Sequence, residues 1–330
     1  MSAGSQLLER VHTKALLVLV IAAVLVVVIT AVISPGIISV LHSIGIAGAG
    51  LDEVAIRTLE LVAIALTFIA LMLLGGSGKA AWGLRHDCVV ARRLGIGFAF
   101  GVLSLGMVCV VLYAFDVRVV RHDVSFQLSY WIPVLAVAML SAAVVGVLEE
   151  VWFRGGLFTL LHRCSGVTAA LFGGSVIYAG AHFLAVPGGV HSGEAQALTA
   201  FEVLEAAAQN VFQMQHLDSF VALFIAGVTL GLVRLRQGDV VMCMGIHAGW
   251  VLTIKVFKKL TYLSPAQTNR FLAGHYDDVV GWTASVCLLV MLIFVWRYMR
   301  PSSSSMASSA PRPRSQPELS PQMQQHPPRE

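Results

Sequence analysis

Two adjacent glutamates, Glu149 and Glu150, interrupt an apolar run of the sequence, and Arg154 follows four residues after the second glutamate. Burying a carboxylate in hydrocarbon costs at least about 2.5 kcal/mol, even on the scale derived from membrane insertion. Such groups persist inside a membrane when they are paired or face a water-filled cavity, and they often mark a functional site. The four-residue spacing places Glu150 and Arg154 on one face of a helix, so we expect them to form an ion pair.

Two histidines in later apolar runs, His182 and His247, are expected at a similar depth in the membrane. Counted along the helices from their basic ends, Glu149 lies about 20 Å deep, His182 about 22 Å and His247 about 16 Å. One glutamate and two histidines at one depth could bind a divalent metal whose bound water becomes a hydroxide. Alternatively, the glutamate could act as a general base on a water held by one histidine, while the other histidine donates to an oxyanion. Both arrangements predict hydrolysis, whereas either histidine alone would more often be a packing residue and Glu150 with Arg154 alone could be a structural pair.

The composition predicts a multi-pass membrane protein. The chain of 330 residues is 57% apolar and 12% charged, with a mean hydropathy of +0.80, whereas soluble domains carry about 25% charged residues. We therefore expect an all-α fold, a membrane bundle of about eight transmembrane helices. The net charge of +4 is modest, and the basic residues gather at the ends of apolar runs, which argues against a nucleic-acid partner.

The elements that must position the candidate residues are eight apolar runs, each close to the roughly 20 residues that span a bilayer. The fourth run is overlong and predicts either one long tilted helix or an interfacial piece followed by a span that starts near Leu140. Several glycines in or beside these runs are expected to let helices approach closely. These glycines are Gly155, Gly156, Gly227, Gly231, Gly245 and Gly249. The runs are residues 15–33, 59–74, 94–113, 131–161, 167–186, 220–233, 240–257 and 279–298.

Basic residues at the ends of these runs predict the orientation of the chain. Most of them fall on one side of the membrane if both termini are cytoplasmic, and the loop 187–218, which has no Lys or Arg, then lies outside. Within that loop, residues 201–216 predict an amphipathic helix at the outer interface. Lys255, Lys258 and Lys259 are the exception, because this orientation places them outside as well.

The predicted organisation has four parts. Residues 1–130 hold about three spans, and residues 131–260 hold all the candidate site residues and form the predicted catalytic core. Residues 261–300 contain the last span. Residues 301–330 are rich in Ser, Pro and Gln without apolar periodicity, which predicts a disordered cytoplasmic tail.

Three motifs of the core resemble those of one family. Glu149-Glu150-x-x-x-Arg154 resembles the EExxxR motif of the CPBP intramembrane proteases, which include CAAX proteases and bacteriocin-processing (ABI-type) enzymes. Tyr178-x-x-x-His182 is similar to their second motif, FxxxH, with tyrosine in place of phenylalanine. Residues 227–236 and the segment 245–250, which contains His247, look like the third region. The resemblance covers about a third of the chain, and the order of the motifs makes the set specific.

The resemblance implies a glutamate-dependent metalloendopeptidase with its site inside the membrane and open to the cytosolic side. Glu149 is implied to be the general base that activates water, and Glu150 and Arg154 to orient the site. His182 would bind that water or a metal, and His247 would bind the metal or stabilise the oxyanion. The implied ligands of a divalent metal, expected to be zinc, are thus Glu149, His182 and His247. The expected substrate is a membrane-associated protein or peptide, and the expected location is a bacterial inner membrane.

One position departs from the family pattern. The third motif often reads HxxxN, and Val251 stands where the asparagine is usual, so an expected oxyanion donor is missing. Another donor must replace it, for example the hydroxyl of Tyr178, or activity is reduced. An inactive family member that acts as a scaffold, immunity or maturation protein is therefore an alternative. A transporter is a third class, but it predicts carboxylates spread over several helices rather than gathered at one position.

Overall fold

The computed structural model describes residues 3–45, 50–73, 78–84, 89–186, 199–266 and 269–298. The predicted tail and residues 187–198 of the predicted outer loop lie outside these ranges. Within them the chain is helical apart from turns and one short pair of antiparallel strands, so the all-α fold class is confirmed.

Six helical stretches of the described chain are long and apolar enough to cross a membrane, and a shorter apolar helix follows them. One stretch, Leu128–Ala181, is kinked at Gly166 and contains two of the predicted spans. Gly166 has a φ of +85°, a conformation that glycine adopts without steric cost. The protein is therefore an integral membrane protein, and its helices cover all eight predicted runs. The other stretches are Ile21–Ser43, Leu51–Leu73, Val90–Ala114, Met214–Gln237 and Val241–Leu260, and the shorter helix is Trp282–Tyr298.

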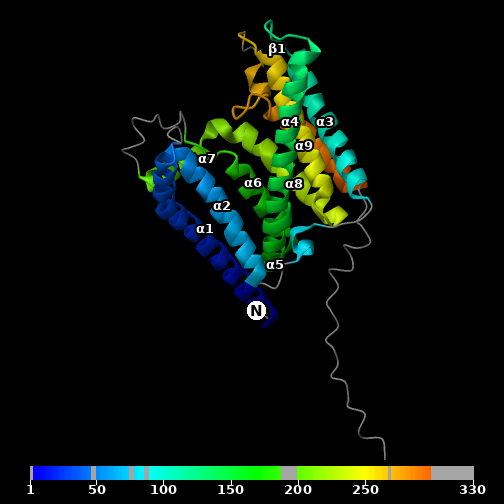
Figure 1. Ribbon diagram of the computed structural model, residues 1–330. Coiled ribbons are helices and arrows are strands. Elements are labelled where there is room, and N and C mark those ends of the chain that lie inside the picture. The colour runs from blue at the N-terminus through cyan, green and yellow to red at the C-terminus, as the bar shows by residue number, and fades with distance from the viewer. Residues whose placement is uncertain are drawn as a thin grey trace, which may run out of the picture.

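The helices form two groups (Figure 1). The first group packs through small apolar clusters that include Ala31, Ala55 and Val203, and the second group surrounds the main core. The predicted amphipathic helix at residues 201–216 is present as α7 and belongs to the first group. The first group contains α1 (Ala3–Ser43), α2 (Leu51–Leu73) and α7 (Ala200–Val211). The second contains α3 (Val90–Ala114), α4 (Leu128–Glu150), α6 (Gly174–Ala181), α8 (Leu217–Gln237), α9 (Val241–Leu260) and α10 (Trp282–Tyr298).

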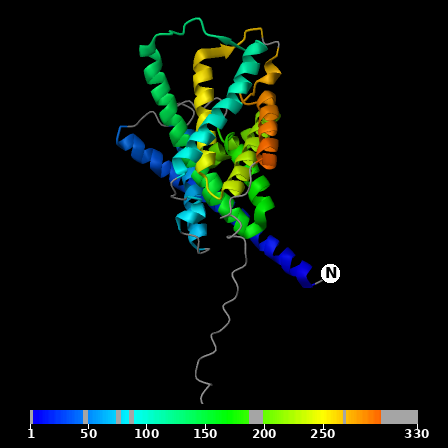
Figure 2. The same cartoon turned by 90° about the vertical axis from the view of Figure 1, so that its right-hand side faces the viewer.

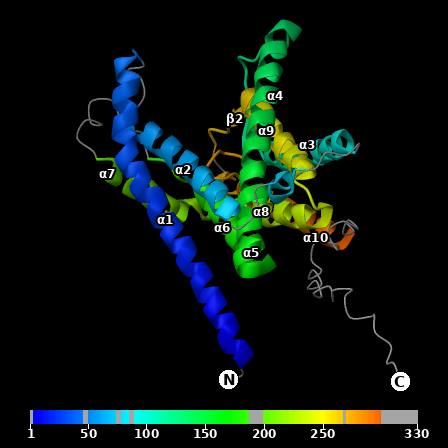
Figure 3. The same cartoon turned by 60° about the horizontal axis from the view of Figure 1, so that its bottom comes forward.

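The overlong fourth run is one continuous helix from Leu128 to the kink at Gly166. It consists of α4, a π-helical turn η2 (Val151–Leu157) and α5 (Phe158–Thr168), and a second π turn η3 (Ala169–Gly173) leads into α6. The alternative of a separate interfacial piece before Leu140 is wrong, because no break occurs there. Figures 2 and 3 show this long helix running past the other core helices from one end of the bundle to the other.

The central helix α9 packs against α3, α4 and α8. Its contact with α3 is the closest, because glycines line both sides of it. A Cβ atom added to Gly245 would lie 2.3 Å from the Leu94 carbonyl oxygen, and one added to Gly249 would lie 2.5 Å from the Phe98 carbonyl oxygen. These two glycines flank His247 in the sequence, so the close approach of the backbones fixes where His247 lies.

Replacing Gly245 with alanine is therefore expected to destabilise the protein by about 1–3 kcal/mol, the usual cost of overpacking a well-packed core. Backbone atoms of α3 cannot move aside as a flexible side chain would. The measurement is thermal unfolding of the purified protein in detergent. Gly106→Ala on α3 is the matched control, because no atom lies within 4 Å of its added Cβ. An equal melting temperature for the two variants would contradict the tight contact.

The antiparallel strands β1 (Arg118–Val120) and β2 (Thr261–Leu263) pair at one end of the bundle. The buried Arg118 guanidinium donates hydrogen bonds to the Thr261 carbonyl oxygen at 2.9 Å and to the Asp278 carbonyl oxygen at 3.2 Å. Burial lowers the pKa of Arg118, while Asp278 and Asp277 oppose that change. The residue thus ties the pair of strands to the loop that precedes α10.

Candidate active site

Glu150 is fully buried and lies at the centre of the polar cluster. Its Oε1 accepts a hydrogen bond from Arg154 Nη1 at 2.8 Å and another from His247 Nδ1 at 2.7 Å. The first bond confirms the predicted pair of Glu150 and Arg154. The second joins two helices that are 97 residues apart in the sequence. One carboxylate therefore fixes the orientation of a guanidinium and of an imidazole.

The sequence of α4 explains why Glu150 rather than Glu149 points inward. The buried residues of this helix recur every fourth position, at Ala138, Ala142, Gly146 and Glu150. Small residues along such a stripe let helices approach closely, and a Cβ added to Gly146 would lie 3.0 Å from the Met244 carbonyl oxygen on α9. Glu150 is thus the last member of the face that packs on α9.

Glu149 projects in a different direction, because adjacent residues on an α-helix are turned by about 100°. Its side chain is 31% exposed, and it lines a cavity beside His247. The Oε2 atom of Glu149 lies 3.8 Å from Nε2 of His247 and has no hydrogen-bond partner among the described residues. Because Nδ1 of His247 donates to Glu150, the Nε2 atom is the ring nitrogen that faces Glu149.

Tyr178 on α6 connects the remaining candidate residues. Its ring lies 4.0 Å from the guanidinium carbon of Arg154, a cation–π contact. The ring centroids of Tyr178 and His182 are 4.7 Å apart, and those of Tyr178 and His247 are 6.3 Å apart. His182 donates from Nδ1 to the Tyr178 carbonyl oxygen at 2.9 Å, so its Nε2 atom is available to another partner. The structure thus brings all five predicted site residues into one cluster around Tyr178.

The π-helical turn η2 begins directly after Glu150 and contains Arg154. A π turn has one more residue per hydrogen-bonded ring than an α turn, is rare, and often occurs at functional sites. Gly155 and Gly156 complete the turn, and Trp82 packs so closely on both that an added Cβ would lie 2.5 and 2.6 Å from its atoms. Trp82 therefore packs directly against the turn.

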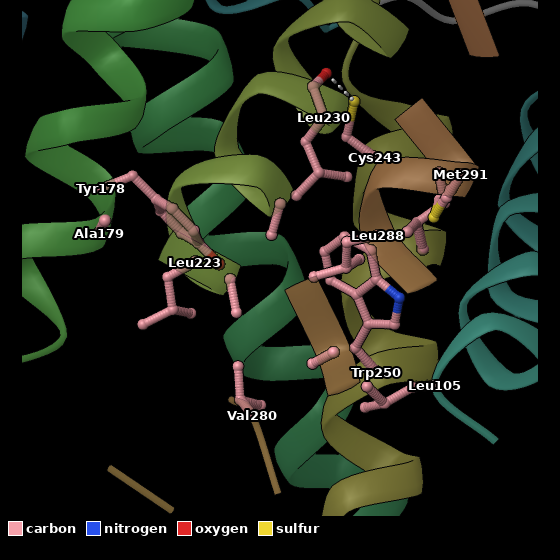
Figure 4. Close-up of a cluster of buried hydrophobic side chains, with 14 of the residues drawn as sticks. Leu105, Tyr178, Ala179, Leu223, Leu230, Cys243, Trp250, Val280, Leu288 and Met291 are labelled. Carbon is pink, nitrogen blue, oxygen red and sulfur yellow. Dashed lines mark hydrogen bonds between the residues drawn. The ribbon is translucent and has the colours of Figure 1, made fainter. Parts of the chain in front are cut away.

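The cluster opens into a cavity of about 720 Å³. Glu149, His182 and His247 lie at one end of its lining, and Tyr276 and Asp277 from the loop before α10 line it as well. Its apolar wall comes from the main core, where Leu223, Trp250 and Val280 lie close together (Figure 4). A chamber of this size, mostly apolar with a few convergent polar groups, has the character of a ligand-binding site.

The cavity extends from the cluster toward the end of the bundle where β1 and β2 pair. On α9 its lining consists of residues that follow His247, such as Val251 and Lys258. The arginines that predict the cytoplasmic side include Arg93 in the first turn of α3 and Arg234 in the last turn of α8. They lie at the other end of the bundle, where α9 begins. The predicted orientation would thus open the cavity to the outside, whereas the resemblance implies a cytosolic opening, so the two expectations cannot both hold.

The comparison with protein families decides what this site belongs to. Residues 131–253 match the model of the family described as type II CAAX prenyl endopeptidase Rce1-like. Residues 131–253 form an Rce1-like domain of the CPBP/CAAX protease family. A search of curated proteins and a search of solved structures found no match.

The Rce1-like domain contains the whole polar cluster. It starts on α4 and ends on α9, so Glu149, Glu150, Arg154, His182 and His247 all fall within it. Since the family is one of endopeptidases, this domain of the membrane protein supports a protease activity. The match lies inside the predicted core of residues 131–260, whose outer boundaries remain predictions.

The donors of the Rce1-like domain do not form a set of metal ligands in this structure. Among the described residues, no three His, Cys, Asp or Glu side chains are placed to hold one metal ion. His247 and His182 each use Nδ1 for a hydrogen bond, to Glu150 and to a backbone carbonyl, and a metal-ligating histidine usually makes such a bond with its second nitrogen. The predicted zinc site on Glu149, His182 and His247 therefore stays a prediction.

Sequence reasoning missed three features of the site. The bond between Glu150 and His247 is one of them, although a buried imidazole needs a partner for its second nitrogen, and this need was a usable signal. Tyr276 and Asp277 lie in an irregular loop, so no periodic pattern marks them. The lysines near Lys258 were visible only as an exception to the orientation rule, and the structure places them in the cavity lining.

Proposed function

We propose that the protein is an intramembrane endopeptidase that hydrolyses peptide bonds of membrane-associated proteins or peptides, with a water activated by Glu149. One observation carries the proposal. The Glu149 side chain lines a cavity, and its buried, unpartnered Oε2 atom lies 3.8 Å from a nitrogen of His247, whose other nitrogen is bound to Glu150. This is the arrangement of a general base beside an oriented imidazole.

In the proposed reaction, a water molecule donates one O–H to Glu149 Oε2 and the other to Nε2 of His247. Glu149 takes the first proton while the oxygen of the water bonds to the carbonyl carbon of the peptide. The tetrahedral intermediate collapses with cleavage of the C–N bond, and Glu149 returns its proton to the leaving amine. Arg154 and Glu150 touch neither substrate nor water in this scheme and position His247.

The oxyanion of the tetrahedral intermediate needs a donor, because Val251 supplies none. Val251 does line the cavity, so the position itself faces the chamber. We assign the donor role to the hydroxyl of Tyr178, whose ring lies between His182 and His247 and lines the same cavity. His182, through its free Nε2 atom, would hold the attacking water or the amide hydrogen of the leaving group.

The proposal is tested by incubating the purified protein, in liposomes, with a set of membrane-tethered peptides in water enriched in ¹⁸O. Hydrolysis by water places one ¹⁸O atom in the new carboxyl group, which mass spectrometry detects. Release of fragments with this label is the expected result. If no tethered peptide is cleaved, the alternative of an inactive scaffold, immunity or maturation protein takes the place of this proposal.

The metal requirement is tested separately, because no step above needs a metal. The predicted zinc site implies that a strong chelator abolishes hydrolysis, whereas the direct mechanism above implies a rate within about twofold of the original. Zinc bound to purified wild type and to His182→Ala is measured in parallel. Stoichiometric zinc that is lost in His182→Ala, together with inactivation by the chelator, would replace the direct mechanism with a metal-based one.

The proposed location is a bacterial inner membrane, with the lipid bilayer as the surrounding partner. The six spanning stretches support a membrane location, and the predicted cytoplasmic termini follow from the basic helix ends.

A further inference from the structure

Three lysines near the end of α9 lie in the lining of the cavity that holds the proposed catalytic residues. Lys255, Lys258 and Lys259 follow His247 by 8, 11 and 12 residues on the same helix and all contribute to the lining. The spacing of three and four residues places them on one helix face. These are the lysines that break the orientation rule, so a structural role in setting the topology does not explain them.

The charge of this lysine cluster is balanced only in part, by Asp277, which interacts electrostatically with Lys258. Among the described residues, none of the three lysines forms a salt bridge. Lys259 contacts the Tyr130 ring, 5.6 Å from its centroid. The carboxylate of Asp277 also lines this part of the cavity, but it accepts hydrogen bonds from the backbone N–H groups of Val279 and Val280 at 3.0 and 2.7 Å. Three positive charges therefore face one carboxylate that already has partners.

The distance from the lysine cluster to the reacting bond can be expressed as a number of residues of an extended peptide. Along α9, at about 1.5 Å per residue, Lys255 lies about 12 Å and Lys259 about 18 Å from His247. An extended peptide advances about 3.3 Å per residue. A substrate chain bound at the water beside His247 would therefore reach the lysines four to five residues from the cleaved bond.

We propose that the lysine cluster binds a carboxylate of the peptide substrate, four to five residues from the bond that is cleaved. The inference rests on the proposed function and names a feature of its substrate. The carboxylate belongs either to an acidic side chain or to the C-terminus of the peptide. A peptide is the favoured ligand over a lipid headgroup, because the lysines line the same chamber as Glu149 rather than only the outer surface of the bundle.

The test compares two membrane-tethered peptides that differ only by Glu or Gln four and five residues from the cleaved bond, each with an amidated C-terminus. The wild type is expected to cleave the Glu peptide with a kcat/KM about tenfold higher at low salt, since several partly exposed ion pairs contribute modestly and are screened by salt. In the combined variant Lys255→Gln, Lys258→Gln and Lys259→Gln the ratio should fall to about one. The arginine versions of the three substitutions should restore it.

Lys79→Gln, an exposed lysine on the 3₁₀ turn Lys79–Trp82 that packs on η2, is the matched control and should keep the wild-type ratio. A third peptide with Gln at both positions and a free C-terminus four to five residues from the cleaved bond distinguishes the two sources of the carboxylate. The proposal is overturned if wild type cleaves neither the Glu peptide nor the peptide with the free C-terminus faster than the amidated Gln peptide. A preference that follows the content of anionic lipid in the vesicles rather than the peptide sequence also overturns it.

Binding separates this proposal from the proposed function. Fluorescence anisotropy with the Glu149→Gln protein measures affinity for the Glu and Gln peptides without any cleavage. Tighter binding of the Glu peptide that is lost in the lysine variant supports the lysine cluster even if no peptide is hydrolysed. Equal binding of both peptides, together with intact hydrolysis by wild type, rejects the lysine cluster and leaves the protease assignment untouched.

Discussion

Glu149→Gln should lower the rate of peptide hydrolysis by about 10²–10⁴-fold, the range in which a general base contributes. The glutamine has the same shape but cannot take the proton from water. Because the Glu149 side chain lies in the cavity and its Oε2 atom makes no hydrogen bond within the described structure, its replacement should leave the fold intact. The measurement is the release of labelled fragments from a membrane-tethered peptide by equal amounts of folded protein.

Glu205→Gln serves as the control for this substitution, since Glu205 is exposed on α7 and accepts a hydrogen bond only from Gln209 in the described structure. It should cleave at the wild-type rate. Wild-type cleavage by Glu149→Gln would remove Glu149 from the mechanism. In that case Glu150 could not simply replace it, because Glu150 is fully buried and is not among the residues that line the cavity.

Arg154→Met should destabilise the protein by about 3–5 kcal/mol, the usual cost of removing one partner of a buried ion pair. Glu150 is fully buried, and without the guanidinium its charge would be supported by His247 alone. The loss should appear as a lower melting temperature in detergent. It should also misplace the imidazole, because Arg154 and His247 share the same carboxylate oxygen.

The double variant Glu150→Gln with Arg154→Met distinguishes two costs. One is the loss of the ion pair itself, and the other is the burial of a Glu150 carboxylate that has lost its partner. Removing both charges leaves no buried ion without a partner, so the double variant should be more stable than Arg154→Met alone. Its hydrolysis should nevertheless stay low, because the neutral amide introduced by Glu150→Gln does not orient His247 as a carboxylate does. Equal stability of the single and double variants would contradict the idea that Arg154 offsets the cost of burying the Glu150 charge.

Part of this site could be predicted because it is local. Glu150 and Arg154 pair across one turn of helix, so their spacing was enough to predict the contact. The similar depth of Glu149, His182 and His247 followed from counting residues along apolar runs. The choice of partner for His247 could not be obtained in this way, because it depends on how α9 packs on α4, a contact between distant segments.

The fold shows the same division. Apolar runs predicted the spans, because a helix that crosses hydrocarbon must be long and apolar. The kink at Gly166 and the π turn after Glu150 leave no such trace, since both depend on packing around a single turn. The direction in which the cavity opens could not be predicted from the sequence either, because it depends on which helices leave space between them.

The π turn has a consequence for chain length. An α-helix advances 3.6 residues per turn, so a stripe of every fourth residue drifts by about 40° at each step, as it does from Ala138 to Glu150. The wider turn that follows takes up this drift and returns Arg154 to the side of Glu150. Deleting one residue between Glu150 and Phe158 would rotate everything after it by about 100° about the helix axis. The helix that carries His182 would then turn away from the cavity. The number of residues in this short segment therefore determines in which direction Tyr178 and His182 of the candidate site point.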